Sequence, residues 1–416
     1  MNALTLIFLI ALAASFAVEW WLMQRQKRHV LEHRDAVPAA FAERITPEAH
    51  RKAADYTLDR LRVSGWDKLL GLALTLLFTL GGGVNWLAGI WGSFALPPLA
   101  AGVGLMLSFF LLSWLLELPL SLYRTFVVEE RHGFNRNTPR QYAKDSALEL
   151  LLGGLIGAPL LAGVLWAMDS AGAGWWLWAW ALLMGFSILM SWAFPTLIAP
   201  LFNKFTPLEN ATLKERIEKL LERCGFHSEG IFVMDGSRRS GHGNAYFTGF
   251  GSHKRIVFFD TLLDTLEPEE VEAVLAHELG HFKRRHVIKS LALGALMTLI
   301  GFALLGWLAG EAWFYAGLGV SLPSNAVALL LFMLISPAFT TLLQPFLTGL
   351  QRRHEFEADD FASQHARAES LVSALVKLYR DNASTLTPDP LYAAFHYSHP
   401  PASVRVGHLT GKAASS

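Results

Sequence analysis

Seven long stretches of mostly apolar side chains set the strongest constraint on how this 416-residue chain folds. A helix that spans a bilayer needs roughly 20 consecutive, mostly apolar residues. Stretches that meet this requirement lie at about 3–23, 69–91, 98–121, 147–168, 174–196, 288–310 and 323–346. Only 17% of the residues are charged, whereas about a quarter are charged in ordinary soluble proteins. The sequence therefore predicts a mainly α-helical, multi-pass membrane protein with seven transmembrane helices.

The overall composition excludes several other classes of protein. Apolar residues make up 52% of the chain, which excludes intrinsic disorder. Cys224 is the single cysteine, so a disulfide scaffold is excluded. Basic and acidic side chains are equal in number, at 35 each, and this balance argues against binding to nucleic acid. The first apolar stretch is longer than the core of a signal peptide and has no basic residue before it, which favours a retained anchor.

Basic residues gather in every second segment between the apolar stretches. Lys and Arg are present at 24–65, at 122–146, at 197–287 and after 346, and the connections after the second, fourth and sixth stretches have none. Basic residues accumulate on the cytoplasmic side of membranes. We therefore expect the N-terminus outside and the C-terminus in the cytoplasm. The membrane is the inner membrane if the source is bacterial, and the endoplasmic reticulum if it is eukaryotic.

The polar segment at 197–287 is long enough to hold structure outside the membrane. Thr206-Pro207-Leu208 indicates the start of a helix that runs to Glu222. β-Branched and aromatic residues predict a strand at Ile231–Met234 and a hairpin formed by Asn244–Phe250 and Lys254–Asp260. The run Gly81-Gly82-Gly83 in the second apolar stretch favours close packing between helices.

A metal-binding pattern follows the predicted hairpin. Pro268 and two acidic residues after it indicate the start of a helix. On this helix His277 and His281 are four residues apart and project from one face. Two imidazoles at this spacing can hold one Zn²⁺ ion, and Glu278 can act on a water molecule at the metal. The pattern His-Glu-x-x-His therefore predicts a zinc protease.

Zinc in such a site needs a third protein ligand. His286 lies five residues after His281, about 140° round a continuous helix, and is expected to face elsewhere. Glu355 is the best candidate, because Asp359 on the same helix face can accept the second N–H group of a ligating histidine. Glu357 points away from that face and is expected to pair with Arg353 at the surface.

Taken in order, these motifs resemble those of the type I CAAX prenyl endopeptidases, which are integral-membrane zinc metalloproteases. The shared motifs are His277-Glu278-x-x-His281, Glu355-x-x-x-Asp359, His399-Pro400-Pro401 with Arg405, Gly133-Phe134-Asn135, Pro200-Leu201-Phe202-Asn203 and Ser240-Gly241-His242-Gly243-Asn244-Ala245-Tyr246. Membrane proteases of the heat-shock type share the metal motifs but have fewer spans. The number of spans favours the CAAX type, and a quality-control protease remains the alternative.

The resemblance implies a fold and an activity. The seven helices would form a barrel around a chamber within the membrane, closed on the cytoplasmic side by a metalloprotease region with a small sheet. The enzyme would cleave near the C-terminus of prenylated CAAX proteins or other membrane-associated peptides. The expected regions are spans one to five (1–196), the part with the metal helix (197–287), spans six and seven (288–346) and the part with the third ligand (347–416).

The resemblance also implies roles for eight residues around one Zn²⁺ ion per chain. His277, His281 and Glu355 would be the ligands, and Glu278 would be the general base. His399 would stabilise the oxyanion, and Asp359 and Arg405 would lie behind the ligands. Asn244 would be part of an edge strand that binds the substrate backbone. The expected partners are a peptide or lipidated C-terminus and membrane lipid, with no nucleic acid. The oligomeric state is left open.

The alternative to an enzyme is a transporter or receptor in which the metal motif occurs by chance. Transport sites usually place ionisable groups near the middle of the bilayer. Glu19, Glu117 and Glu149 lie near the ends of their predicted spans, and no Asp, Glu, Lys or Arg lies in the middle of one. This distribution leaves few groups for ion coupling, and the metal content of the purified protein would separate the two possibilities.

Overall fold

The computed structural model describes residues 2–248 and 255–413. The long helices are α1 (Ala3–Glu32), α2 (Pro47–Phe78), α4 (Pro98–Tyr123), α5 (Pro139–Ser170), α6 (Trp175–Ala193), α11 (His286–Leu308), α13 (Asn325–Thr340) and α14 (Gln344–His365). Shorter helices are α3 (Gly83–Ser93), α7 (Ala199–Phe202), α8 (Ala211–Arg223), α9 (Asp260–Leu263), α10 (Pro268–Lys283), α12 (Ala312–Gly317), α15 (Ala368–Asp381), α16 (Pro390–His396) and α17 (Ala402–Ala413). Turns of π-helix follow α4 (η2, Arg124–Glu129) and α6 (η4, Phe194–Ile198). Turns of 3₁₀-helix lie at Ala39–Phe41, Gly172–Gly174, Gly236–Arg238 and Thr341–Leu343.

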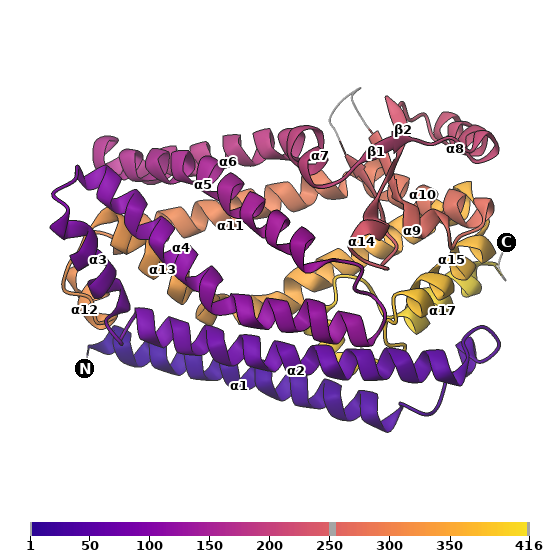
Figure 1. Cartoon of the computed structure of the whole chain (residues 1–416), viewed down its shortest axis with the longest axis horizontal. Coiled ribbons are helices and arrows are strands. Elements are labelled where there is room, and N and C mark those ends of the chain that lie inside the picture. Colours follow the sequence, from indigo (N-terminus) through magenta and orange to yellow (C-terminus); the bar gives the residue numbers. More distant parts are fainter. Residues whose placement is uncertain (1, 249–254, 414–416) are drawn as a thin grey trace.

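The long helices run side by side along the longest axis of the molecule (Figure 1). Within the described residues, six helical segments are long and apolar enough to cross a bilayer, and there are seven if α2 and α3 form one bent span. The prediction of a mainly α-helical protein is confirmed, and the seven predicted spans are found when α2 and α3 are counted as one span.

The second span differs from its prediction as one continuous helix. The α2–α3 pair bends by 55°, and the break lies at Gly81-Gly82-Gly83. Gly82 adopts φ +80°, a left-handed conformation that glycine adopts without steric cost. A Cβ atom at Gly81 would lie 2.7 Å from the carbonyl oxygen of Leu77. These glycines therefore permit a sharp turn of the chain, and the prediction that they pack helices together is wrong.

The helices form an open barrel rather than a solid bundle. In the apolar stretches of α1 and of the segment Gly172–Phe202, 6% of residues are buried, whereas the stretch that contains α13 is 44% buried. Helices in a solid bundle bury one stripe of side chains each. Only α13 comes close to that state, because it contacts α1, α4, α5 and α11.

A four-stranded sheet lies at one end of the barrel, where Figure 1 shows β1 and β2 beside α10. Its strands are β1 (Phe205–Pro207), β2 (Gly230–Met234), β3 (Ala245–Thr248) and β4 (Arg255–Phe259), in the order β1-β2-β4-β3. The pairs β1–β2 and β3–β4 are antiparallel, and β2–β4 is parallel. The sequence correctly predicted β2 and the β3–β4 pairing, although the predicted hairpin turn lies outside the described residues.

The predicted helix start at Thr206-Pro207-Leu208 is wrong. Pro207 ends β1, an edge strand where the missing N–H group of proline is tolerated. The helix α8 begins only after Asn210, whose side chain accepts a hydrogen bond from the N–H group of Leu213 at 3.0 Å. An asparagine in this position is a typical helix N-cap.

The two largest of three apolar clusters in the described residues stabilise the two ends of the molecule. The sheet-side cluster joins α8, the sheet, α10, α15 and α17 through side chains such as Ile217, Phe258, Leu279, Leu375 and Leu409. The membrane-side cluster joins the barrel helices through side chains such as Phe8, Met106, Leu165, Phe314 and Leu330. The predicted metal helix α10 belongs to the sheet-side cluster, where it packs along α14.

Candidate metal centre and active site

The helix that carries His277 and His281 has a well-defined start. Pro268 occupies its first turn, and Glu267 and Glu270 form a capping box in which the N–H group of Glu267 donates to Glu270 at 2.8 Å. The helix approaches α14 at Gly280, where a Cβ atom would lie 2.9 Å from the Cα atom of Ala358. Because of this close approach, the side chains one helical turn from Gly280 on α10 lie near those one turn from Ala358 on α14.

Three side chains converge where α10 and α14 meet. The Nε2 atoms of His277 and His281 lie 3.2 Å apart. Glu355 places Oε2 3.5 Å from Nε2 of His277 and Oε1 3.2 Å from Nε2 of His281. The ligand atoms of all three residues lie within 4.8 Å of one another. The structure thus brings together the two histidines and the glutamate that the sequence analysis selected.

These distances suit a metal ion. Ligand atoms about 2.1 Å from a tetrahedral metal are separated by about 3.4 Å, close to the three separations observed. Glu355 is buried, and its Oε2 atom accepts no hydrogen bond, although Nη1 of Arg405 lies 3.5 Å away as an ion-pair partner. A buried oxygen without a hydrogen bond is unfavourable unless a ligand satisfies it. The donor set therefore fits a metal ion bound by two nitrogens and one oxygen.

Behind the first histidine lies a buried pair of opposite charges. Asp359 accepts a hydrogen bond from Nδ1 of His277 at 2.8 Å, and Arg405 donates to Asp359 through Nε at 2.9 Å. Burial and the charge of Arg405 lower the pKa of His277, but hydrogen bonds to Asp359 and Glu355 outweigh them and raise it to about 9 in the metal-free chain. With Nδ1 of His277 held by Asp359, Nε2 faces Glu355 and the second histidine.

Behind the second histidine lies a group that the sequence analysis placed elsewhere. Nδ1 of His281 lies 3.0 Å from Nδ1 of His286, so the prediction that His286 faces away is wrong. The helix α10 ends at Lys283, and Arg285 adopts φ +57° before α11 begins. This break ends the regular rotation of the helix and turns His286 back toward His281.

Glu357 completes this second chain of hydrogen bonds. Its Oε2 atom lies 3.0 Å from Nε2 of His286 and 3.6 Å from Nζ of Lys289. The predicted pair with Arg353 is not among the ion pairs of the described residues. His286 is buried and also stacks on His354 with ring centroids 4.1 Å apart. Glu357 therefore contacts the site indirectly, through a histidine.

Glu278 and His399 lie beside the three converging side chains. Burial raises the pKa of the Glu278 carboxyl, which is the direction expected of a proton acceptor that works near neutral pH. His399 follows α16 and places Nε2 3.5 Å from Oε1 of Glu355, while its side chain remains 62% exposed. Its Nδ1 atom lies 2.9 Å from the hydroxyl of Ser398.

Asn244 lies immediately before the edge strand β3. Its side chain is exposed and accepts a hydrogen bond from the N–H group of Ala245, and its backbone carbonyl accepts one from Phe259 on β4. The preceding Gly243 donates its N–H group to Asn382 at 3.1 Å. The other edge of β3 has no strand beside it in the described sheet.

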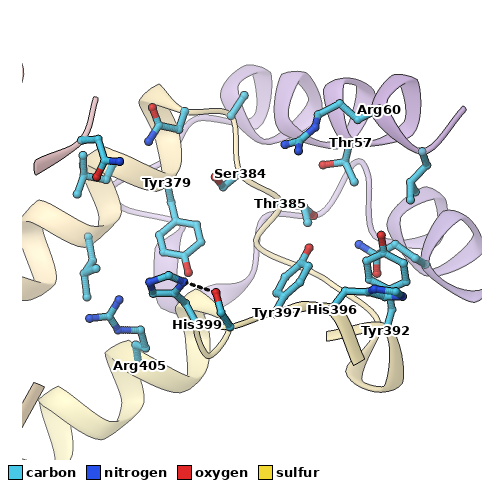
Figure 2. A pocket seen from close by; sticks show the side chains of 18 of the residues that line it. Thr57, Arg60, Tyr379, Ser384, Thr385, Tyr392, His396, Tyr397, His399 and Arg405 are labelled. Carbon is cyan, nitrogen blue, oxygen red and sulfur yellow. Dashed lines mark hydrogen bonds between the residues drawn. The ribbon is translucent and has the colours of Figure 1, made fainter. Parts of the chain in front are cut away.

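A cavity of about 520 Å³ opens beside this site. Figure 2 shows His399 and Arg405 at one side of it and Arg60 of α2 at another. Tyr379 and Tyr397 also line it. The sequence analysis missed Arg60, Tyr379 and Tyr397, because they lie outside the metal motifs and no local pattern links α2 to the region after α14.

Comparisons with known proteins agree with this arrangement. The family model described as "CAAX prenyl protease N-terminal, five membrane helices" matches residues 26–204, and the model of peptidase family M48 matches residues 207–413. The CAAX prenyl protease 1 homolog of Homo sapiens is 34% identical, covering 97% of this chain and 95% of its own. CAAX prenyl protease 1 of Saccharomyces cerevisiae is 33% identical, covering 95% and 93%.

A solved structure shows the same fold. The crystal structure of S. mikatae Ste24p superposes with a TM-score of 0.91 at 32% identity, covering 98% of this chain and 99% of that one. The enzyme interpretation is thereby confirmed over that of a transporter or receptor. The chain belongs to the CAAX prenyl protease 1 family, which are multi-pass membrane metalloendopeptidases of peptidase family M48.

Proposed function

We propose that this protein is a zinc endopeptidase that cleaves near the C-terminus of prenylated CAAX-type or other membrane-associated peptides. The observation that carries the proposal is the convergence of His277, His281 and Glu355 at the separations of a tetrahedral zinc site, with Glu278 beside them. The names of the curated relatives support the choice of substrate class.

The chain's own residues divide the chemical work. Zinc, when bound by the three ligands, supplies Lewis acidity that polarises the peptide carbonyl and acidifies water. Glu278 accepts the proton of the attacking water and delivers it to the leaving amine. His399, exposed beside Glu355, donates a hydrogen bond to the oxygen that becomes negative during the attack.

Two further groups position the reacting partners. Asp359, held by Arg405, keeps the Nδ1 proton of His277 and so leaves Nε2 free for the metal. The free edge of β3, which begins after Asn244, binds the substrate backbone by strand addition. The basic segments at 24–65 and after 346 support a cytoplasmic location for this site, with the N-terminus outside.

Substitution of Glu278 by Gln tests the mechanism. Because Glu278 is not a metal ligand in this proposal, the variant should retain one zinc ion per chain. Loss of the general base should lower kcat by about 10²–10⁴-fold. Zinc content by elemental analysis and cleavage of a prenylated peptide measure the two effects on the same sample.

The matched control is Glu269→Gln on the same helix. Glu269 is an exposed partner of Arg216 in the first turn of α10, so its variant should retain both zinc and turnover. Wild-type turnover in Glu278→Gln, or loss of its zinc, would refute the assignment of the base.

A further inference from the structure

The cavity beside the metal site is unusually rich in hydrogen-bond donors. Its charged or titratable nitrogen groups are those of Arg60, His396, His399 and Arg405, and its described lining includes no Asp or Glu. Hydroxyl groups of Thr57, Ser64, Ser384, Thr385 and Tyr397 complete much of the wall, as Figure 2 shows in part. A cavity with this composition favours an anion.

Arg60 is the cation of this cavity that has no carboxylate partner. Its guanidinium lies over the ring of Tyr56, 5.5 Å from the centroid, and it forms no ion pair within the described part of the chain. By contrast, the charge of Arg405 is neutralised by Asp359. The side chain of Arg60 is exposed, and the space that it faces is the cavity (Figure 2).

The carboxylates near Arg60 are already engaged by other groups. Asp59 binds Arg62 at 2.9 Å, Arg131 at 2.7 Å and His132 at 3.0 Å. Glu129 accepts a hydrogen bond from the hydroxyl of Tyr56 at 2.6 Å. Asp59 is therefore not available to neutralise Arg60, and Glu129, which interacts electrostatically with Arg60, forms no ion pair with Arg60 within the described residues.

A buried amide lies on the same wall. Gln26 of α1 is fully buried, and its Nε2 atom has no hydrogen-bond partner. Its Oε1 atom accepts a hydrogen bond from the N–H group of Asp389, which fixes the amide so that Nε2 is the group left over. The Gln26 side chain also interacts with the hydroxyl of Tyr397, another residue of the lining, so the amide adds hydrogen-bonding capacity to this wall without marking a missing acceptor.

We propose that this cavity binds the C-terminal carboxylate of the substrate peptide, with Arg60 as the residue that pairs with it. This inference rests on the proposed function, because a peptide cut near its end brings one carboxylate to within a few residues of the scissile bond. Three extended residues span about 10 Å, which suits a cavity that has His399 and Arg405 on one side and Arg60 on another.

The cavity is not suited to the lipid of the substrate. A prenyl chain offers no hydrogen-bond acceptor, and burying the charge of Arg60 against it without a partner would be strongly unfavourable. The apolar side chains of the lining, Leu61, Leu375, Leu378 and Ala383, are outnumbered by polar ones. The lipid of a prenylated substrate therefore occupies another part of the molecule.

The experiment compares two farnesylated peptides of one sequence, one with a free C-terminal carboxylate and one with a C-terminal carboxamide. The zinc-loaded full chain should cleave the carboxylate peptide with a kcat/KM about 10- to 100-fold higher. Arg60→Gln should lower the value for the carboxylate peptide to that for the carboxamide, and should leave the carboxamide value unchanged.

The matched control is Arg62→Gln. Arg62 lies on the same helix, pairs with Asp59 and does not line the cavity, so its variant should keep the full preference for the carboxylate. Equal cleavage of both peptides by the wild type, or an equal loss on both peptides in Arg60→Gln, would overturn the proposal.

Binding to the zinc-loaded Glu278→Gln chain separates this proposal from the proposed function. Tighter binding of the carboxylate peptide that depends on Arg60 supports the subsite, even if the wild type cleaves neither peptide and the proposed function fails. Cleavage without discrimination leaves the function intact and refutes the subsite. Cleavage could instead be faster in phosphatidylserine vesicles than in phosphatidylcholine vesicles, in a way that depends on Arg60, with no difference between the two peptides. That result would assign the cavity to a lipid headgroup and would also refute the carboxylate subsite.

Discussion

At the scale of single residues, the two histidines of α10 are held by different groups. His277 has a carboxylate directly behind it, in Asp359 at 2.8 Å. His281 has another histidine, His286, which is in turn backed by Glu357. If Nε2 of His281 faces the metal, its Nδ1 carries a proton and donates it to Nδ1 of His286. His286 then carries its own proton on Nε2 and donates it to Glu357, so one arrangement of protons satisfies the whole chain.

This chain of hydrogen bonds gives Glu357 a measurable effect on the metal. Groups that orient a ligating histidine typically contribute 10–100-fold to metal affinity. We expect His286→Phe to raise the dissociation constant of zinc by about that factor, and Glu357→Gln to raise it by about tenfold or less. Competition with a chelator of known affinity measures both values without reference to activity.

Arg353→Gln is the control for these two variants. Sequence spacing pairs Arg353 with Glu357 on the helix surface, whereas the structure pairs Glu357 with His286. Zinc affinity should therefore be unchanged in Arg353→Gln. An equal effect of Arg353→Gln and Glu357→Gln would contradict the indirect role of Glu357.

Helix periodicity explains which of these residues were predictable. His277, His281, Glu355 and Asp359 lie within uninterrupted helices, so counting 100° per residue places them correctly on their faces. His286 follows a break at Arg285, whose φ of +57° is uncommon for a residue other than glycine. No glycine or proline marks that break in the sequence, so regular helical rotation predicts the wrong direction for His286.

At the scale of elements, the site depends on how closely α10 approaches α14. Gly280 lies between the two histidines on α10 and faces Ala358, which lies between Glu355 and Asp359 on α14. Two small residues at the crossing let the backbones approach, and the four functional side chains flank that point. The spacing of the helices is therefore part of the geometry of the metal site.

Substitution of Gly280 by Ala should push the two helices apart. A Cβ atom there would lie 2.9 Å from Cα and 3.0 Å from the carbonyl oxygen of Ala358, and backbone atoms cannot rotate out of the way. We expect a loss of zinc affinity of at least tenfold, because ligand atoms must stay within a few tenths of an ångström of their positions. Zinc per chain after dialysis at fixed free zinc reports the loss.

The control is Gly294→Ala in α11, where an added Cβ atom meets nothing within 4 Å. Alanine is the better helix former by about 1 kcal/mol, so this variant should keep its zinc and gain slightly in melting temperature. Retention of full zinc affinity by Gly280→Ala would show that the helix spacing is not critical.

Elements with a strong local signal were predicted, and those set by tertiary contacts were not. The apolar stretches, β2 and the β3–β4 pairing follow from residue patterns alone. The bend after α2 was missed because hydrophobicity continues through the three glycines. The strand β1 was missed because three residues with a proline carry no strand signal of their own, and only the pairing with β2 makes them a strand.

At the scale of the whole molecule, the cavity joins parts of the chain that are far apart in sequence. Arg60 lies on α2, while His399 and Arg405 lie near the other end of the chain (Figure 2). The two largest apolar clusters are separate, and a small third cluster joins α2 to Ala383 of the cavity lining, where the barrel helices meet the metalloprotease region. Local residue patterns do not show which helix face meets which loop, so the metal ligands could be predicted and the cavity could not.

The orientation in the membrane is testable at this scale. The α1–α2 and α5–α6 connections lie at opposite ends of the long axis (Figure 1). In a Cys224→Ala background, a cysteine at Ala40 should resist an impermeant thiol reagent added outside intact cells, and one at Ala173 should react. Both positions are exposed. Ala173 is preferable to Gly172, whose φ of +64° disfavours a side chain.

Permeabilised cells provide the control, because both cysteines should then react. Labelling of Ala40→Cys in intact cells, with protection of Ala173→Cys, would place the metal site outside the cytoplasm and reverse the proposed topology.

The position of the ligands along the chain also has a consequence for biosynthesis. His277 and His281 precede the last two spans, whereas Glu355, Asp359 and Arg405 all follow α13. The ribosome therefore completes the apolar part of each described span before it adds the third ligand. A growing chain cannot assemble the metal site while its helices are still entering the bilayer. The order of translation thus keeps the metal site incomplete during insertion of these helices.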